Sequence, residues 1–340
     1  MQASFPKIRV IGAGIVGLTV AHEFALAGQS VEIIERADGP GRGCSFFAGG
    51  MLAPWCEEES AEPLVREWGR EGLEYWTKIV PVAEVRGTLV VAPPRDRPDL
   101  LRFSRLTTGF DWLDRSGLAD REPDLAQRFD TALFYPAEAH LDPRQAVCAL
   151  TGRLRQFENV TFRFNTAAES LSGAADWIID CRGYGARDSL ADLRGVKGEM
   201  LVLATGEISL KRPVRLLHPR HPVYVVPRGD GRFMVGATVI ENETRRVTAR
   251  SILELLSAAY ALHPAFGEAE IIEMGADLRP AFPDNLPRIR RSGRVVHVNG
   301  LYRHGFLLAP ALARRTAAAV LKDAFFPEVM DEHRSERQTA

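Results

Sequence analysis

The sequence lacks the features that would place the protein in a membrane, in a secretory pathway or on nucleic acid. No uninterrupted apolar run reaches the roughly 18 residues that a membrane-spanning helix needs. The few residues before Lys7 leave no room for a signal peptide. Lys and Arg number 43 against 44 Asp and Glu, so no basic excess favours nucleic acid. We expect a cytoplasmic protein without a membrane or nucleic-acid partner.

Cysteine is also scarce. The four cysteines, Cys44, Cys56, Cys148 and Cys181, form no CxxC pair and no spacing typical of metal ligands. We expect reduced thiols and no metal. The remaining composition, 46% hydrophobic and 26% charged, is ordinary for a globular protein. A chain of 340 residues is long enough for two interleaved domains, or for one large α/β domain that carries a second layer.

The strongest local pattern lies near the start of the chain. Residues 7–11 have the apolar character of a buried strand, and they lead into the GxGxxG motif Gly12-Ala-Gly-Ile-Val-Gly17. A helix over 15–27 and a second strand over 30–35 follow, and that strand ends on Glu35. Strand, glycines, helix, strand and acid in this order are typical of a dinucleotide-binding βαβ unit.

Each part of this pattern has a physical role toward a dinucleotide. Gly12 permits the tight turn, Gly14 lets the backbone approach a pyrophosphate, and Gly17 lets the helix pack closely on the sheet. The helix N-terminus offers N–H groups to the phosphates. Glu35 stands where a carboxylate accepts hydrogen bonds from ribose hydroxyls. The sequence therefore predicts a bound dinucleotide rather than a glycine-rich turn without a ligand.

The chain after the second strand favours FAD over NAD. Small residues dominate 39–54, which indicates a backbone that runs close to a flat ligand. Loops of this length are seldom mere connectors. Gly183-Tyr-Gly185 does not continue into a second GxGxxG, so a flavin reductase with a separate NAD(P)H site is ruled out.

Helices and strands alternate through the rest of the chain. We expect helices over 64–80, 142–157, 248–262 and 308–322. We expect strands over 86–92, 160–164, 176–181, 270–275 and 295–299, and several strand-like segments over 199–239 with a hairpin turn at Arg228-Gly-Asp-Gly231.

Five stretches together resemble a known family. They are the GAGIVG motif ending at Glu35, AGGMLAP at 48–54 with three glutamates after it, VKGEM at 196–200, YVVPR and VGAT at 224–238, and LRPAFPD with GLYRHGFLLAP at 278–310. In this order they are similar to the glycine oxidases of the D-amino-acid oxidase superfamily, enzymes associated with thiamine biosynthesis. The resemblance implies FAD-dependent oxidative deamination of glycine, sarcosine or small D-amino acids, with O2 reduced to H2O2.

The resemblance also implies a fold and roles for single residues. Arg279 would bind the substrate carboxylate, helped by Tyr224 and Arg303. The substrate and O2 would be the small-molecule partners, and the protein would be a homo-oligomer. Non-covalent FAD would be lined by Gly12, Gly14, Ile15, Val16, Gly17, Glu35, Arg36, Cys44, Ser45, Gly49, Gly50, Met51, Ala167, Leu301, Tyr302, His304, Gly305, Phe306 and Leu307.

The expected fold is α/β (α+β), a Rossmann-like FAD-binding domain of the D-amino-acid oxidase type with an antiparallel-sheet substrate domain. The FAD-binding domain would comprise 1–85, 140–200 and 275–330, the substrate domain 86–139 and 201–274, and a polar tail 331–340. Departures from the family pattern occur at Arg42-Gly-Cys-Ser45, at Asp180-Cys-Arg-Gly183, which replaces Ala-x-Gly, and at Pro287-Arg-Ile-Arg290, which replaces Pro-x-Ile-Gly.

The residue types suit amine oxidation without acid–base catalysis. Arginine pairs with a carboxylate through two parallel hydrogen bonds, although Arg279 or Arg303 alone could equally be a surface ion-pair residue. Tyr224 could close the carboxylate site or be an ordinary strand tyrosine. No acid–base pair is evident, and hydride transfer to a flavin needs none if the amine is deprotonated. Two alternatives stay open: a D-amino acid or sarcosine dehydrogenase that passes electrons to a carrier or quinone, and a non-catalytic FAD-stabilised interaction subunit.

Overall fold

The computed structural model describes residues 7–167, 175–218 and 222–331. The chain forms two compact units, each assembled from separate segments. The first unit comprises the described parts of 1–46, 144–196 and 278–340, and the second those of 47–143 and 197–277. The chain passes between the units at four points, two of which lie within the long strands β10 (Arg194–Ala204) and β15 (Glu270–Ala281).

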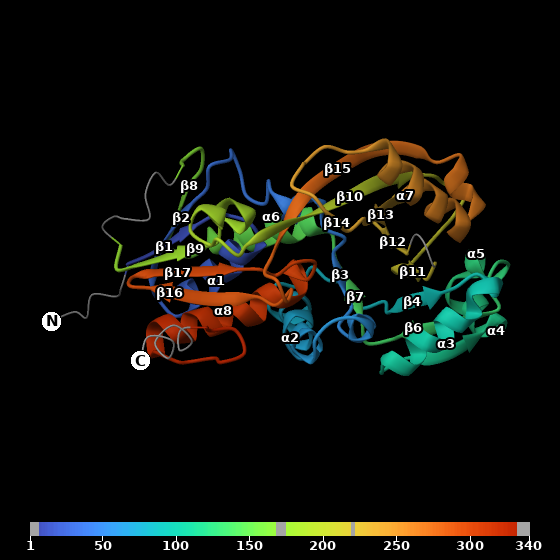
Figure 1. Cartoon of the computed structure of the whole chain (residues 1–340), viewed down its shortest axis with the longest axis horizontal. Coiled ribbons are helices and arrows are strands. Elements are labelled where there is room, and N and C mark those ends of the chain that lie inside the picture. The colour runs from blue at the N-terminus through green and yellow to red at the C-terminus, as the bar shows by residue number, and fades with distance from the viewer. Residues whose placement is uncertain (1–6, 168–174, 219–221, 332–340) are drawn as a thin grey trace. The chain divides into compact units, whose positions relative to one another are not determined.

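A mostly parallel sheet forms the centre of the first unit (Figure 1). Its strands are β1 (Lys7–Ile11), β2 (Ser30–Ile34), β8 (Val160–Arg163), β9 (Trp177–Asp180), β16 (Arg288–Ser292) and β17 (Val295–Asn299). Their order is β16-β17-β9-β1-β2-β8, and the edge strand β16 runs antiparallel to β17. Since both faces of a parallel sheet are covered, its inner strands carry buried apolar residues, such as Ile8, Val10 and Ile11 of β1.

Helix α1 (Ile15–Leu26) packs on this sheet and lies beside α8 (Gly305–Lys322), as Figure 1 shows. Leu18, Val20 and Phe24 on α1 are fully buried. The helix is apolar on all sides because strands and a second helix surround it. Helix α6 (Pro143–Leu154) begins at the boundary between the units.

A nine-stranded, largely antiparallel sheet dominates the second unit. It contains β4 (Thr88–Val91), β5 (Asp111–Asp114), β6 (Thr131–Tyr135), β11 (Val214–Leu216), β12 (Val223–Pro227), β13 (Arg232–Gly236) and β14 (Ile240–Glu241), together with β10 and β15. The order is β14-β10-β13-β12-β11-β4-β6-β5, with β15 paired to β10. A separate small ladder joins β3 (Met51–Leu52) to β7 (Ala139–His140).

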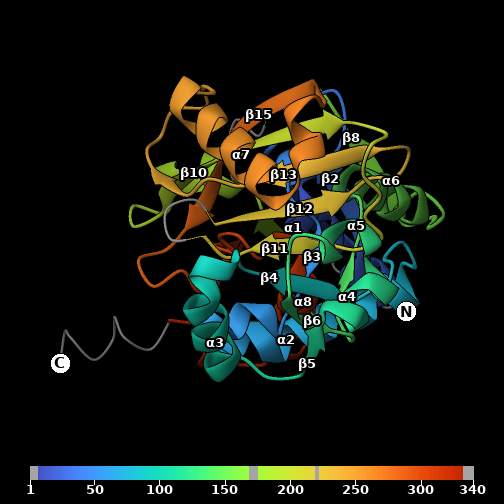
Figure 2. The ribbon, with the colours of Figure 1, turned by 90° about the vertical axis from the view of Figure 1, so that its right-hand side faces the viewer.

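The helices of the second unit are α2 (Pro63–Glu74), α3 (Arg97–Leu106), α4 (Arg115–Arg121), α5 (Pro123–Ala126) and α7 (Ala249–Leu262). Figure 2 shows α7 over strands β12 and β13. Leu255 and Leu262 of α7 share a buried cluster with Val225 and Phe233 of those strands. Thr248 starts the helix, since its hydroxyl accepts a hydrogen bond from the N–H of Ser251.

The expected mixture of a parallel and an antiparallel sheet is confirmed, and so is the hairpin between β12 and β13. Two differences matter. Helix α8 begins at Gly305 rather than 308, because no side chain caps its N-terminus and the sequence therefore carries no start signal. Residues 47–85 belong to the second compact unit, whereas the sequence suggested that the FAD-binding segment runs to residue 85.

No helix in the described part of the chain is long and apolar enough to cross a bilayer. No cluster of His, Cys, Asp and Glu with the make-up of a metal site occurs among the described residues.

Candidate cofactor and substrate site

The glycine turn after β1 depends on close backbone approaches. Gly12 has a φ of +99°, and a Cβ there would lie 2.6 Å from the carbonyl oxygen of Cys181. A Cβ at Gly17 would overlap the carbonyl oxygen of Gly12. At Gly14 the nearest atom to a Cβ would be the Ser45 hydroxyl oxygen, 3.5 Å away. Gly12 and Gly17 are thus required by the chain itself, while Gly14 leaves room for a ligand.

The carboxylate of Glu35 holds this turn. Its two oxygens accept hydrogen bonds from the N–H groups of Ala13 (2.7 Å) and Ala37 (2.9 Å). A carboxylate has lone pairs for further donors, so these bonds are compatible with a ribose hydroxyl. The Thr166 N–H donates to the Glu35 carbonyl (3.0 Å), which places the exposed Ala167 beside the same strand end.

Two helix N-termini lie next to each other in the first unit. The Ile15 N–H at the start of α1 donates to the Ser45 hydroxyl (3.1 Å). A Cβ at Gly305, the first residue of α8, would lie 3.5 Å from Cγ2 of Ile15. Helix N-termini attract anions through their N–H groups and dipoles, so this pair suits a pyrophosphate. The residues fit a dinucleotide of the FAD type.

The remaining predicted FAD-lining residues divide between the units. The first unit also holds Val16, Arg36, Cys44, Leu301, Tyr302, His304, Phe306 and Leu307. Arg36 is exposed, whereas Leu301, His304, Phe306 and Leu307 are buried. Gly49, Gly50 and Met51 belong to the second unit.

Arg279 and Arg303 both belong to the first unit. Arg279 is half-buried near the end of β15, and Arg303 is exposed in the segment before α8. The carbonyl of Pro280, directly after Arg279, accepts a hydrogen bond from the Tyr302 N–H (2.9 Å). The structure thus brings the two arginine-bearing segments together.

Tyr224 lies in the second unit against the small-residue segment. A Cβ at Gly49 would lie 2.6 Å from Cε2 of Tyr224 and 3.0 Å from its hydroxyl oxygen. Gly50 has a φ of +71° and its carbonyl accepts the Leu141 N–H at 2.9 Å. Glycine at position 49 lets this backbone pass under the tyrosine ring, and glycine at position 50 lets it approach the Leu141 carbonyl. A predicted substrate residue and two predicted flavin neighbours therefore lie together.

Arg228 has a structural role that the sequence did not reveal. Its guanidinium donates to the carbonyls of Gly49 (2.8 Å), Leu141 (3.1 Å) and Ala48 (3.4 Å). Its side chain is only 10% exposed. Arg228 stood in the YVVPR motif, but a motif does not say which backbone its side chain binds. It fixes the glycine segment on which Tyr224 rests.

Glu138 anchors the chain just after this segment. Its carboxylate accepts the N–H groups of Trp55 (3.0 Å) and Cys56 (2.8 Å). The residue is fully buried. Burial raises the pKa of Glu138 to about 7, although the hydrogen bond from the Cys56 N–H opposes the rise. This acid supports the backbone of the second unit.

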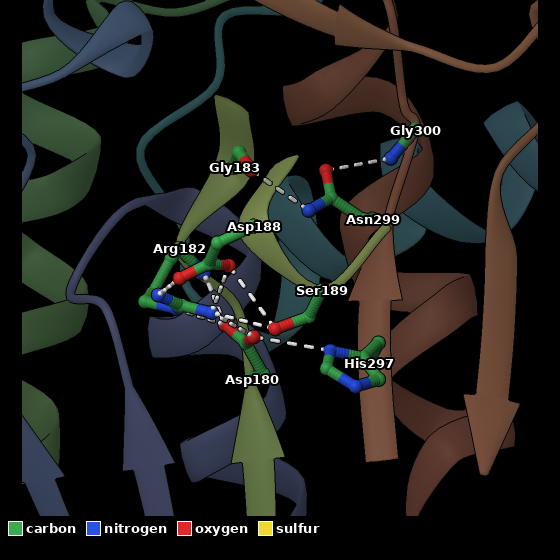
Figure 3. Close-up of polar contacts among 8 residues, drawn as sticks. All are labelled: Asp180, Arg182, Gly183, Asp188, Ser189, His297, Asn299 and Gly300. Atoms are coloured by element: carbon green, nitrogen blue, oxygen red, sulfur yellow. Dashed lines mark hydrogen bonds and ion pairs between the residues drawn. The ribbon is translucent and has the colours of Figure 1, made fainter. Parts of the chain in front are cut away.

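A charged network at the ends of β9 and β17 was also missed (Figure 3). Asp180 is fully buried and binds Arg182 and His297. Burial acts to raise the pKa of Asp180, but the hydrogen bonds from His297 and Arg182 outweigh it and leave the pKa below its usual value. The only signal in the sequence was the departure Asp180-Cys-Arg-Gly183 from the family pattern.

The glycine turn, the adjoining helix starts and the parallel sheet agree with the family comparison. Residues 7–319 match the model of the DAO family, described as FAD dependent oxidoreductase. The chain belongs to this family. It is an FAD-dependent oxidoreductase with the D-amino-acid oxidase type of fold, as the sequence predicted.

Its relatives include named oxidases. A putative thiamine biosynthesis oxidoreductase ThiO of Rhizobium etli is 54% identical over 95% of this chain and 98% of that protein. A glycine oxidase of Bacillus licheniformis is 26% identical over 97% of both chains. The crystal structure of glycine oxidase from Bacillus cereus superposes with a TM-score of 0.82 at 22% identity, covering 94% of this chain and 98% of that one.

Proposed function

We propose that the protein oxidises glycine at its Cα to the imine, with O2 reduced to H2O2, and that the imine supplies the thiazole branch of thiamine synthesis. The names of the Rhizobium etli and Bacillus licheniformis relatives support this proposal. Sarcosine and small D-amino acids are further candidate substrates. When bound, FAD would supply the acceptor for the Cα hydride and the route for the electrons to O2.

One observation carries the assignment of the substrate arginine. The hydrogen bond from Tyr302 N–H to the Pro280 carbonyl joins the Arg279 segment to the segment that enters α8 beside the glycine turn. A carboxylate bound by Arg279 would thereby be oriented from the unit that carries the cofactor motif. The planar guanidinium supplies two parallel hydrogen bonds, which fix the orientation of an amino acid better than a point charge does.

Tyr224 and Arg303 are proposed as further substrate-binding residues. The position of Tyr224 is set by Gly49 beneath its ring and by Arg228, which holds the Gly49 carbonyl. The chain need not supply a strong base, because an amine that binds deprotonated already has the lone pair that drives loss of hydride. Binding and orientation are then the tasks of the protein.

The decisive experiment is an absorption spectrum of the purified protein before and after anaerobic addition of glycine. Bleaching of the flavin by glycine, followed by recovery in air with release of peroxide, is the expected result. Bleaching by sarcosine or D-alanine but not by glycine would change the proposed substrate and leave the proposed reaction as it is. Reduction by glycine without reoxidation in air would favour the dehydrogenase alternative. A flavoprotein that none of these amines reduces would contradict the proposal.

Replacement of Arg279 tests the carboxylate site. Arg279→Lys keeps the positive charge but cannot form the two parallel hydrogen bonds of a guanidinium. We therefore expect kcat/KM for glycine to fall on the order of 100-fold, mostly through a higher KM. Arg291→Gln is a matched control in the same unit, because Arg291 lies on β16 and pairs with Asp323. The control should keep wild-type kinetics. Equal kinetics for both variants would contradict the role of Arg279.

The remaining assignments are proposals of the same kind. We propose that the first unit binds FAD non-covalently and that the second unit, with its antiparallel sheet, is the substrate domain. Acid precipitation should leave the yellow colour in the supernatant. We also propose a cytoplasmic homo-oligomer, for which light scattering should give a mass that is a multiple of the 37.6 kDa chain.

A further inference from the structure

A network of charged and polar side chains links the chain segments that follow β9 and β17, both within the first unit (Figure 3). Asp180 is the last residue of β9 and is fully buried. Arg182 donates to one carboxylate oxygen of Asp180 from Nε (2.9 Å) and to the other from Nη2 (2.9 Å). His297 on β17 contacts Asp180 through Nδ1 at 3.0 Å. This carboxylate therefore joins two neighbouring parallel strands.

Arg182 extends the network to the turn after β9. Its Nη1 and Nη2 atoms donate to the two carboxylate oxygens of Asp188 at 2.9 and 2.8 Å. Asp188 ends the 3-10 helix Gly183–Asp188. One guanidinium thus holds two carboxylates and fixes this short helix on the end of the strand. Because Arg182 is 20% exposed and Asp180 is fully buried, water competes weakly for the hydrogen bonds between these two residues.

Asn299 connects that helix to the segment that leads into α8. Its side-chain N–H donates to the carbonyl of Gly183 (2.9 Å), and its side-chain oxygen accepts the N–H of Gly300 (2.9 Å). Figure 3 shows Asn299 between these two glycines. A change in the 3-10 helix would therefore be transmitted to Gly300.

The 300–304 turn needs such support because one non-glycine residue in it, Tyr302, has a left-handed backbone conformation. Gly300 has a φ of +84° and Tyr302 a φ of +49°. A left-handed conformation costs a non-glycine residue about 1–2 kcal/mol. The Tyr302 N–H is held by the carbonyl of Pro280, and the His304 N–H by that of Leu301. Contacts on both sides of the turn keep it in this conformation.

A second departure from the family pattern ends at the same turn. The Arg290 guanidinium lies 4.5 Å from the centre of the Phe282 ring and binds Asp192 with two hydrogen bonds (2.7 and 2.8 Å). A Cβ at Gly300 would overlap the Phe282 ring, so this ring packs directly on the glycine. Two unusual arginines, Arg182 and Arg290, thus support the same turn from different elements.

We propose that Asp180, Arg182 and Asn299 are positioning residues that hold the 300–304 turn in the conformation that binds FAD. The turn leads into the N-terminus of α8, which lies beside the first residue of α1. An apolar cluster would provide as much stability as a buried ion network, so stability alone does not explain the charges. The charges specify one conformation instead. This inference concerns the cofactor and is independent of which amine is oxidised.

FAD affinity of the apoprotein tests the proposal. FAD would be removed, and its dissociation constant measured by flavin fluorescence for wild type, Arg182→Gln and Asn299→Ala. We expect both variants to bind FAD about 10–100-fold more weakly, because only part of the apoprotein population would have the competent turn. Hydrogen exchange of the 300–304 amides in the apoprotein should rise in both variants.

Arg9→Gln is the matched control, since Arg9 on β1 pairs with Glu32 (2.7 Å) in the same sheet but away from these turns. It should lower the melting temperature and leave FAD affinity within about twofold of wild type. If Arg182→Gln and Asn299→Ala bind FAD as tightly as Arg9→Gln does, the network serves stability alone and the proposal is overturned.

A milder pair of variants covers the case in which Arg182→Gln does not fold. Asn299→Asp keeps an acceptor for the Gly300 N–H but loses the donor to the Gly183 carbonyl. Asn299→Gln keeps both groups on a longer side chain that cannot reach both partners at once. Weaker FAD binding by the folded variants supports the link between the two turns. Wild-type affinity in both overturns it.

Discussion

The turn after β1 is held by backbone atoms and one half-buried carboxylate, whereas the turns after β9 and β17 are held by charged side chains. Glu35 accepts two backbone N–H groups that lie within 22 positions of it along the chain. Asp180 accepts one backbone N–H, that of Arg182 (3.1 Å), and in addition binds a guanidinium and an imidazole that is 117 positions away. Both carboxylates end or follow strands of one sheet.

This difference shows two ways to fix a ligand-binding turn. Backbone support needs small residues at set positions, and therefore leaves a motif that repeats between proteins. Side-chain support can be built from many residue types at many positions, so it leaves no motif. The stability of the turn after β1 should therefore depend mostly on close backbone packing, and that of the turns after β9 and β17 on charged side chains.

The largest effect should come from glycine replacement in the first turn. Gly17→Ala places a Cβ on the Gly12 carbonyl oxygen and should destabilise the apoprotein by at least about 3 kcal/mol in urea unfolding. Gly14→Ala meets only the Ser45 hydroxyl and should unfold within about 1 kcal/mol of wild type, yet bind FAD more weakly. Equal unfolding midpoints for the two variants would show that stability does not depend on the close packing of Gly17 against the Gly12 carbonyl.

The next largest effect should be the loss of stability when the carboxylate of Asp180 is removed, which should exceed the loss for Glu35. Asp180→Ala leaves the partly buried guanidinium of Arg182 with Asp188 as its remaining partner and should cost about 3 kcal/mol of apoprotein stability. Glu35→Ala removes hydrogen bonds to backbone N–H groups that solvent can partly replace, and should cost about 1–3 kcal/mol. Urea unfolding of both apoproteins is the measurement. A larger loss for Glu35→Ala would reverse the comparison.

The Asp180 contribution should also depend on pH. The pKa of Asp180 is lower in the folded state than in the unfolded state, so its stabilisation is complete above the unfolded value of about 3.9. It is lost as the pH falls through the folded pKa. The stability difference between wild type and Asp180→Asn should therefore shrink in acid. A difference that stays constant from neutral pH to about pH 3 would argue against an ionised Asp180.

The smallest effect should come from Ser45. Ser45→Ala removes the acceptor for the Ile15 N–H at the start of α1 and should cost about 1 kcal/mol. FAD affinity should fall as well, since Ser45 is among the residues that the sequence predicts to line the cofactor. Thermal unfolding of the apoprotein would measure the loss of stability, and its comparison with the holoprotein would measure the loss of FAD affinity. Stabilisation of the apoprotein by this replacement would contradict the role given to Ser45.

The sequence was most informative where structure is local. Strand Lys7–Ile11, the glycines and Glu35 lie within a short range, and the family they indicate is confirmed. The strand 295–299 is confirmed residue for residue. Between β4 and β7 the sequence predicted no helix or strand, although this stretch contains α3, β5, α4, α5 and β6. Its helices are short and take their stability from packing, which the local pattern does not show.

The sequence by itself determined the dinucleotide motif, the cofactor class and the residue types suited to a carboxylate. These follow from backbone geometry, which admits only glycine at a few positions such as Gly12 and Gly17. Only the tertiary structure decided that Arg228 holds the Gly49 carbonyl and that Asp180 joins Arg182 to His297. Such contacts depend on where distant strands end in space, and the physical reason is that side-chain partners are chosen by proximity rather than by position in the chain.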